Sequence, residues 1–314
     1  MDTPRRSAVT GAFGFSGRAI ADALLARGDE VVTLTRRTPP GDDALGSRLT
    51  AAAPLAFDRP VELADALAGV DTLFNTYWIR FPRGEATFDR AVVDSAVLFA
   101  AARRAGVRRI VHLSVVGANP DAPTPYVRAK GRLEGMLRAS GLEWAIVRPT
   151  LTYGPNDILV NNLAWALRRL PVYGMPGDGR YPIQPVHVDD VAAICLEAAA
   201  GKSGAMLDAA GPEKLAFREM VGLVRGAIRS RSLVVGMPHW AVLAAARVLG
   251  RFVGDVVLTR DEITELTSGW LTSNEPPRGR IRFSDWVLAN GQLLGHRWSS
   301  ELARNYRIEA APLR

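Results

Sequence analysis

Short β-branched runs alternate with longer amphipathic stretches along the first half of the chain. The strand-like runs lie at 7–11, 30–36, 71–77, 108–117 and 143–150, with a weaker one at 52–58. Helical patterns fill the gaps, at about 16–27, 61–68, 85–105 and 126–140. Nearly continuous apolar strands that alternate with helices are typical of a parallel sheet covered on both faces. The sequence therefore predicts an α/β fold with a doubly wound parallel sheet.

The alternation changes after Pro149. Residues 151–182 combine a helix with a Gly/Pro-rich loop at 173–182, a further helix follows from about 189, and 205–211 has the pattern of one more strand. From 213 to 314 the pattern is helical and loop-like. We therefore expect residues 1–150, completed by about 183–212, to form the sheet domain, and residues 151–182 and 213–314 to form a smaller, mostly helical region.

The composition excludes several classes of protein. All but three of the 39 basic residues are arginine, and they are scattered along the chain rather than gathered in one stripe, which argues against a nucleic-acid partner despite a formal charge of +7. A single cysteine, Cys195, allows no intrachain disulfide. The start, MDTPRRSAVTG, runs directly into a strand pattern, so we expect no signal peptide and a cytoplasmic location. The chain offers no spacing that suggests a metal site.

The stretch at 233–258, LVVGMPHWAVLAAARVLGRFVGDVVL, is the most apolar of the chain. Pro238, His239, Arg247 and Arg251 interrupt it, so we expect no transmembrane segment. We interpret it as a core or dimer-interface helix, with peripheral contact to a membrane surface as the alternative. Nearby tryptophans, Trp240 among them, suit either an aromatic-lined pocket or a core.

Three glycines mark the first strand-to-helix turn. In AVTGAFGFSGRAI, residues 8–20, Gly11, Gly14 and Gly17 are evenly spaced. Glycine permits turn conformations that a Cβ would forbid. Without side chains, the loop also lets a pyrophosphate reach the amides at the helix N-terminus, where the helix dipole favours negative charge. The loop therefore predicts a dinucleotide site, with Thr10 and Phe15 beside the glycines.

The loop TGAFGFSG resembles the T-G-x-x-G-x-x-G loop of the short-chain dehydrogenase/reductase superfamily, in its extended and atypical branches. The second strand ends in Arg36 and Arg37, where proteins that bind NAD usually place an acid. Because guanidinium groups fit a ribose 2′-phosphate, we expect NADP(H) to be preferred, with NAD(H) as the alternative. The alternative is that both arginines are exposed to solvent and do not bind a cofactor. Asp58 resembles the acid that many members place near the adenine amine, or is a turn residue.

A tyrosine and a lysine lie four residues apart in YVRAK. Tyr126 and Lys130 therefore share one face of the expected helix. A tyrosine with its ordinary pKa of about 10 is a poor acid or base at neutral pH, and a nearby ammonium lowers that pKa. The pair resembles the superfamily's Y-x-x-x-K motif. The resemblance implies that Tyr126 is the general acid/base, that Lys130 also holds the nicotinamide ribose, and that Ser114 orients the substrate oxygen.

Two later segments, GLEWAIVRPTLTYGPND and PVHVDDVA, are also similar to extended and atypical members, so the resemblance covers about residues 7–212. It implies that residues 1–150 with about 183–212 are an NAD(P)-binding Rossmann core, with Pro149 on the nicotinamide side. Residues 151–182 and 213–314 would then bind the substrate. Asp189 or Asp190 is a natural N-cap for the helix that follows.

The resemblance favours an NADP(H)-dependent oxidoreductase that acts on the carbonyl or hydroxyl carbon of a small organic substrate, as a monomer or homodimer. One alternative is a sugar-nucleotide epimerase or dehydratase, because the same three residues support it. A second is a non-catalytic NADP(H)-binding redox sensor or assembly subunit, similar to respiratory complex I accessory subunits or nitrogen-regulation sensors. Many such proteins lack the Tyr/Lys pair, and this chain keeps it, which favours an enzyme.

Overall fold

A seven-stranded sheet lies at the centre of the first of two compact units, which comprises Met1–Pro149 and Val188–Ala209. The computed structural model describes residues 5–37 and 44–306. All neighbouring strands are parallel, in the order β11-β6-β5-β4-β1-β2-β3. The strands are β1 (Arg6–Thr10), β2 (Glu30–Thr35), β3 (Ala51–Pro54), β4 (Thr72–Asn75), β5 (Arg109–Leu113), β6 (Glu143–Pro149) and β11 (Ala205–Ala209).

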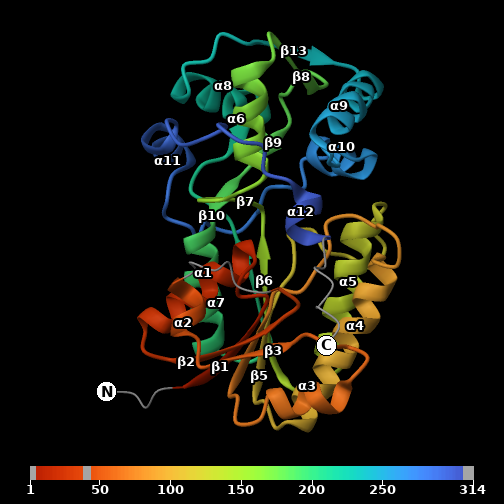
Figure 1. Cartoon of the computed structure of the whole chain (residues 1–314), viewed down its shortest axis with the longest axis vertical. Coiled ribbons are helices and arrows are strands. Elements are labelled where there is room, and N and C mark those ends of the chain that lie inside the picture. The colour runs from red at the N-terminus through yellow and green to blue at the C-terminus, as the bar shows by residue number, and fades with distance from the viewer. Residues whose placement is uncertain (1–4, 38–43, 307–314) are drawn as a thin grey trace, which may run out of the picture. The chain divides into compact units, whose positions relative to one another are not determined.

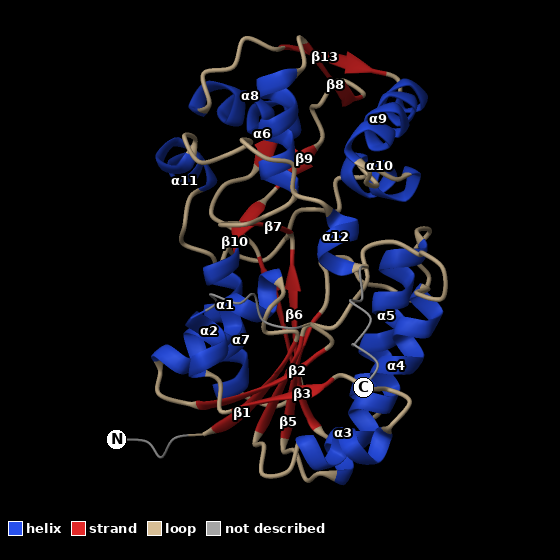
Figure 2. Cartoon of the chain, in the orientation of Figure 1, coloured by secondary structure: helices blue, strands red, loops and turns tan. Residues whose placement is uncertain are grey.

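Helices cover both faces of this sheet (Figures 1 and 2). One face carries α1 (Phe15–Ala26), α2 (Ala44–Arg48) and α7 (Val188–Ala200). The opposite face carries α3 (Pro60–Ala66), α4 (Phe88–Arg104) and α5 (Pro125–Arg138). The prediction of a doubly wound α/β fold is therefore confirmed.

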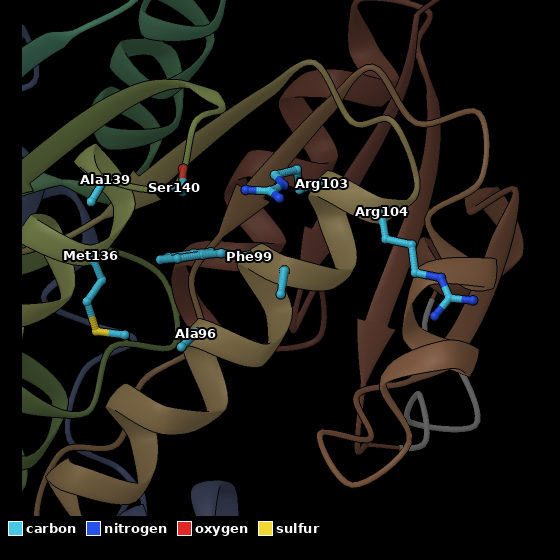
Figure 3. A pocket seen from close by; sticks show the side chains of 8 residues that line it. Ala96, Phe99, Arg103, Arg104, Met136, Ala139 and Ser140 are labelled. Carbon is cyan, nitrogen blue, oxygen red and sulfur yellow. The ribbon is translucent and has the colours of Figure 1, made fainter.

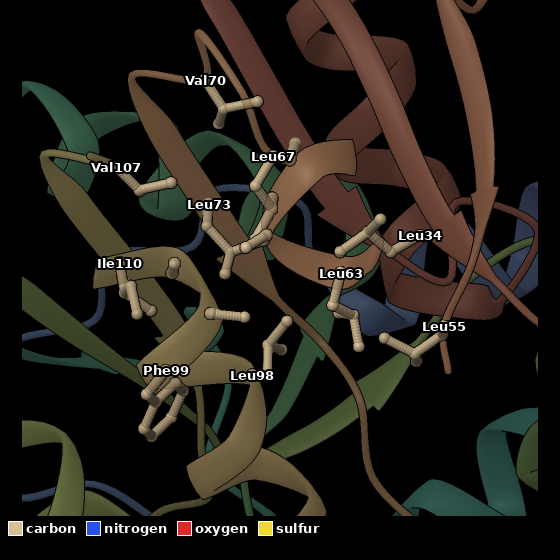
Figure 4. Packing of buried hydrophobic residues seen from close by; sticks show 14 of the residues in the cluster. Leu34, Leu55, Leu63, Leu67, Val70, Leu73, Leu98, Phe99, Val107 and Ile110 are labelled. Carbon is tan, nitrogen blue, oxygen red and sulfur yellow. The ribbon is translucent and has the colours of Figure 1, made fainter. Parts of the chain in front are cut away.

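An apolar layer joins the sheet to α3, α4 and α5. Leu34, Leu73 and Ile110 project from the strands and are fully buried against Leu63 and Leu98 of the helices (Figure 4). Each such side chain contributes on the order of 1.5–3 kcal/mol by leaving water. This layer keeps the strands in register, and the ends of the strands position the candidate site.

The order of the strands reverses between β1 and β4. The chain moves outward from β1 through β2 to β3, and then returns to β4 on the other side of β1. In open parallel sheets, nucleotides bind at the carboxyl ends of the strands beside such a reversal. The loops that follow β1 and β4 are therefore the expected location of a cofactor.

The second unit comprises Thr150–His187 and Ala210–Arg314. It contains three short strand pairs, β7 with β10, β9 with β12 and β8 with β13. Its own core includes Tyr153, Phe217, Met220 and Phe283. Its elements are β7 (Leu151–Tyr153), α6 (Leu159–Arg169), β8 (Val172–Pro176), β9 (Pro182–Ile183), β10 (Pro185–His187), β12 (Leu215–Ala216), α8 (Phe217–Ala227), β13 (Leu233–Met237), α9 (His239–Val253), α10 (Arg260–Thr267), α11 (Phe283–Asn290) and α12 (Glu301–Asn305).

The structure corrects the interpretation of 233–258 as a single core or interface helix. Its first residues form β13, which pairs with β8, so part of the loop expected at 173–182 is also a strand. Pro238 separates β13 from α9 because it has no amide hydrogen with which to extend the strand, whereas as the N-cap of α9 it occupies a position where the helix needs no amide donor. In α9 only Val242 and Ala246 are buried, and Trp240 is exposed rather than part of a core.

Two smaller corrections concern the ends of elements. The third strand stops at Pro54, so Asp58 lies beyond it in a turn rather than at its end. The helix α7 already begins at Val188, which places Asp189 and Asp190 in its first turn rather than at its cap. Acids there still complement the helix dipole. Within residues 5–37 and 44–306, none of the helices combines the length and the apolar character needed to cross a membrane.

Candidate functional site

The glycine loop connects β1 to α1 through a tight turn. Gly11 adopts a φ of +67°, and its amide donates a hydrogen bond to the carbonyl of Leu34, at 2.8 Å. The Gly14 amide donates to the Gly11 carbonyl, at 2.7 Å. A Cβ on Gly17 would lie 2.2 Å from that same carbonyl oxygen, closer than two atoms can approach. The turn therefore requires glycine at its start and inside the helix.

The first turn of α1 suits an anion. Gly14 is its N-cap and makes no side-chain capping bond, and Phe15 is its first residue. The first amides of a helix have no partner within the helix, and the helix dipole adds positive potential there. A loop that a Cβ would fill, leading into an uncapped helix, fits a dinucleotide pyrophosphate. Gly11, Gly14, Phe15 and Gly17 are the residues that would hold it.

Thr10 is fully buried, and its hydroxyl has partners inside the protein. It donates to Asn75 Oδ1, at 3.2 Å, and accepts from the amides of Thr76, at 2.7 Å, and Tyr77, at 3.0 Å. Asn75 Nδ2 lies 3.2 Å from Nδ1 of His112, whose pKa is lowered by burial. The Thr10 side chain thus fixes the loop after β4, and its contact with a cofactor stays a prediction.

Both arginines after β2 contact neighbouring backbone. Arg36 Nε donates to the Leu55 carbonyl, at 3.1 Å, and its guanidinium carbon lies 5.2 Å from the centre of the Phe57 ring. Arg37 Nη1 donates to the carbonyl of Phe13, within the glycine loop, at 3.3 Å. Asp58 is exposed in the turn that follows Phe57. The structure therefore gathers the glycine loop, both arginines and Asp58 around the ends of β1, β2 and β3.

Tyr126 and Lys130 lie on successive turns of α5 and share one neighbour, Trp78. The Lys130 Nζ lies 4.3 Å from the centre of the indole ring. The ring of Tyr126 meets Trp78 edge-on with 6.0 Å between centres, and meets Phe88 in the same way at 5.8 Å. Since Trp78 follows β4 by three residues, Thr10 and Asn75 indirectly set its position. Trp78 was not predicted from the sequence.

The Lys130 side chain is buried, with 3% of its surface exposed. Its Nζ donates to the Leu113 carbonyl, at 2.9 Å. Burial lowers the pKa of Lys130 to about 7, because the charged form loses its hydration. The indole face of Trp78 and the Glu134 carboxylate act in the opposite direction and favour the ammonium. Lys130 can therefore gain or lose a proton near neutral pH.

Ser114 follows β5 directly and donates its hydroxyl hydrogen to Oε1 of Glu134, at 2.6 Å. Glu134 is 2% exposed and also accepts from Nε of Arg148, at 2.9 Å, in a two-point ion pair. Glu134 was not predicted from the sequence. The available signal was its position one turn after Lys130, on the same helix face as Tyr126 and Lys130.

Backbone hydrogen bonds hold the ends of β5 and β6 together. The Ser114 amide donates to Val147, at 2.8 Å, and the Val116 amide donates to the carbonyl of Pro149, at 3.0 Å. Pro149 is itself buried at the end of β6. This arrangement places Pro149 beside the strand end that carries Ser114. Its contact with a nicotinamide stays a prediction.

A separate groove of about 480 Å³ lies between the C-terminal halves of α4 and α5 (Figure 3). Phe99, Arg103, Met136 and Ser140 are among its lining residues. None of the predicted site residues lines it. No group of three or more His, Cys, Asp or Glu side chains among residues 5–37 and 44–306 is arranged to hold a metal ion.

One family of known proteins matches more than half of the chain. The profile of the NAD(P)H-binding family matches residues 11–200, which span the glycine loop, Ser114, Tyr126 and Lys130. The chain belongs to this family. Within it, the chain is an NAD(P)-binding protein, and its curated relatives include reductases.

Two curated relatives and one solved structure illustrate what this chain is similar to. The (4-alkanoyl-5-oxo-2,5-dihydrofuran-3-yl)methyl phosphate reductase of Streptomyces griseus is 32% identical over 217 residues, 67% of this chain and 70% of its own length. The mitochondrial NADH dehydrogenase [ubiquinone] 1 alpha subcomplex subunit 9 of Arabidopsis thaliana is 24% identical over 92% of this chain and 75% of its own length. An NADPH-dependent quinone oxidoreductase of Escherichia coli, solved with NADPH, shares the fold with a TM-score of 0.72 at 19% identity, over 90% of this chain and 98% of its own.

Proposed function

We propose that this family member reduces the carbonyl group of a small organic substrate with NADPH. The observation that supports the proposal is the pairing of Tyr126 with a buried Lys130 that is bonded to the strand end carrying Ser114. A buried lysine without a catalytic or binding role is uncommon, because removing its charge from water is costly. In this proposal the first unit binds the cofactor and the second selects the substrate.

NADPH supplies the hydride when it is bound. Tyr126 donates its proton to the carbonyl oxygen as that oxygen gains charge, and is the general acid. The Lys130 ammonium stabilises the resulting phenolate, and its own pKa of about 7 suits it to return a proton at neutral pH. Trp78 packs against both side chains and limits their contact with water.

Ser114 has a more specific role than sequence resemblance alone implies. Its hydrogen is directed to Glu134, so its oxygen is the part available to a substrate. A hydroxyl in this state accepts a hydrogen bond from an alcohol and does not donate one to a carbonyl. Ser114 therefore holds the hydroxyl side of the reaction, and Tyr126 is the donor to the carbonyl. We expect Ser114→Ala to reduce turnover less than Tyr126→Phe.

The preference for NADP(H) rests on the two arginines after β2. Arg37 contacts the glycine loop, and Arg36 lies over Phe57 with its side chain exposed. A ribose 2′-phosphate beside them would gain charge-assisted hydrogen bonds, on the order of 1.5–3 kcal/mol each. Titration of NADPH and NADH onto wild-type protein and Arg36→Ala tests this. We expect Arg36→Ala to reduce the preference for NADPH over NADH at least tenfold. Equal binding of both cofactors by the wild type would contradict the proposed preference.

The experiment that tests the function compares Tyr126→Phe with the wild type. Loss of the phenol should lower kcat by about 10²–10⁴-fold while the Kd for NADPH changes by less than about twofold. The similarity to the NADH dehydrogenase subunit favours a second candidate, an NADP(H)-binding assembly subunit. If the chain is such a subunit, removal of the Tyr126 hydroxyl should change no phenotype. Unchanged turnover in Tyr126→Phe would overturn the reductase proposal.

A further inference from the structure

The helix α9 exposes a stripe of large apolar side chains. Trp240 is 73% exposed, Val248 57% and Phe252 84%. Val248 and Phe252 lie eight and twelve positions after Trp240, which confines the three residues to an arc of about 120° on the helix surface. Val242 and Ala246 are buried on the side that packs against the second unit. The helix is therefore amphipathic, with an apolar stripe directed to solvent.

Positive charge borders the stripe. Arg247 and Arg251 are exposed and lie four residues apart at the Trp240 edge of the arc, Arg247 about 20° outside it and Arg251 about 20° inside it. From Arg231 to Arg260 the chain has four arginines and one acidic residue, Asp255. Asp255 is buried and accepts hydrogen bonds from Trp298 Nε1 and the Glu301 amide, both at 2.9 Å. The surface of this segment is therefore cationic.

The neighbouring strand pair extends the exposed apolar surface. Leu233 of β13 and Val172 of β8 are directly opposite each other, and both are exposed. Figure 1 shows β8, β13 and α9 side by side within the second unit, and α9 packs against β8. Large exposed apolar patches bordered by polar residues mark sites of association.

We propose that α9 attaches this unit to the surface of an anionic lipid bilayer. Trp240, Val248 and Phe252 enter the boundary between headgroups and acyl chains, and Arg247 and Arg251 contact lipid phosphates. An apolar face bordered by arginines and aromatic side chains is the pattern of a helix that lies in the interface plane. A second copy of the chain fits less well, because the same face of that copy would cover Arg247 and Arg251 and offer no exposed acid, since the one acid of this segment, Asp255, is buried.

The test is flotation of the full chain with vesicles of phosphatidylcholine alone or of phosphatidylcholine with phosphatidylglycerol. We expect binding to the anionic vesicles to be at least tenfold stronger, and to weaken as salt is raised. The double variant Trp240→Ser/Phe252→Ser should lose at least tenfold in partitioning. The double variant Arg247→Gln/Arg251→Gln should lose the preference for anionic lipid.

The matched control is Leu288→Ser/Leu293→Ser, whose positions are 75% and 77% exposed but lie outside α9. It should bind vesicles like the wild type. Equal binding to both vesicle types, or an equal loss in the control, overturns the proposal. A wild-type dimer that Trp240→Ser/Phe252→Ser dissociates, with no vesicle binding, overturns it in favour of a second copy. None of these readouts depends on enzymatic activity, so they are independent of the proposed reaction.

Discussion

Two regions depart in opposite ways from the usual distribution of buried apolar and exposed charged side chains. One is the end of β5 with α5, in the first unit, and the other is the exposed face of α9, in the second. In the first, Lys130 and Glu134 are buried, and each has a polar partner: the Leu113 carbonyl for Lys130 and Arg148 for Glu134. In the second, Trp240 and Phe252 are exposed and apolar. Both departures cost stability, and both occur where we propose a function, chemistry in one case and attachment in the other. Substitutions should therefore have large effects on stability at the first region and small ones at the second.

The largest expected effect on folding is at Glu134. Glu134→Gln leaves the Arg148 guanidinium without its carboxylate in a buried setting and should lower the free energy of unfolding by about 3 kcal/mol. Urea denaturation measures it. Glu62→Gln is the control, because Glu62 pairs with Arg59 at an exposed position, where an ion pair contributes less than about 1 kcal/mol. If both substitutions lowered the free energy of unfolding equally, the buried pair of Glu134 and Arg148 would contribute no more than an exposed one.

Gly17→Ala should weaken NADPH binding at least about 100-fold, because its Cβ would meet the Gly11 carbonyl and shift the loop. Isothermal titration measures the loss. Gly135→Ala, on α5, is the control, since a Cβ there has no atom within 4 Å. It should leave binding unchanged and stabilise the helix by about 0.5–1 kcal/mol. If Gly17→Ala kept its affinity for NADPH, the glycine loop would not be part of the cofactor site.

Lys130 should make stability depend on pH. Its pKa is about 7 in the folded chain and near 10.5 when unfolded, so between these values the unfolded chain binds more protons. The free energy of unfolding should therefore rise with pH across this window, by up to about 1.4 kcal/mol per unit. Denaturation of the wild type and of Lys130→Met between pH 7.5 and 9.5 should show that the variant lacks this slope. If the free energy of unfolding rose equally with pH in both proteins, the pH dependence would come from groups other than Lys130.

The smallest effect is expected at α9. Phe252→Ser removes a side chain that is 84% exposed and should change the free energy of unfolding by less than about 0.5 kcal/mol in lipid-free solution. The same substitution at a buried position of the second unit, Leu163→Ser, should cost several kcal/mol. A large cost at Phe252 would mean that the protein itself covers this face.

The sequence predicts the first unit well because its elements are set by local pattern. Each β-branched run becomes a strand of the sheet, and the three glycines lie in and just after the turn between β1 and α1, where the sequence predicts them. Glu134 could not be recognised in the same way. A glutamate one turn after a lysine usually forms an exposed pair, and only the packing of α5 against the ends of β5 and β6 buries it.

The second unit was predicted less accurately because its strands depend on distant partners. Val234 and Val235 read equally well as the start of a helix, and it is pairing with Tyr173 and Gly174 that makes them a strand. The exposure of Trp240 is also set by tertiary contacts, since the same helical pattern would suit a buried helix. Local sequence thus determines where α9 forms, and the surrounding fold determines which face is exposed.

The most direct test of the central claim follows deuterium from NADPH labelled at the transferred position of the nicotinamide, with a library of small ketones and aldehydes as substrates. If this chain is a carbonyl reductase, the wild type transfers deuterium to the carbinol carbon of a product. Tyr126→Phe should do so at least about 100-fold more slowly, although it binds NADPH equally well. Tight NADPH binding with no deuterium in any product would contradict a reductase and favour a sensor or subunit.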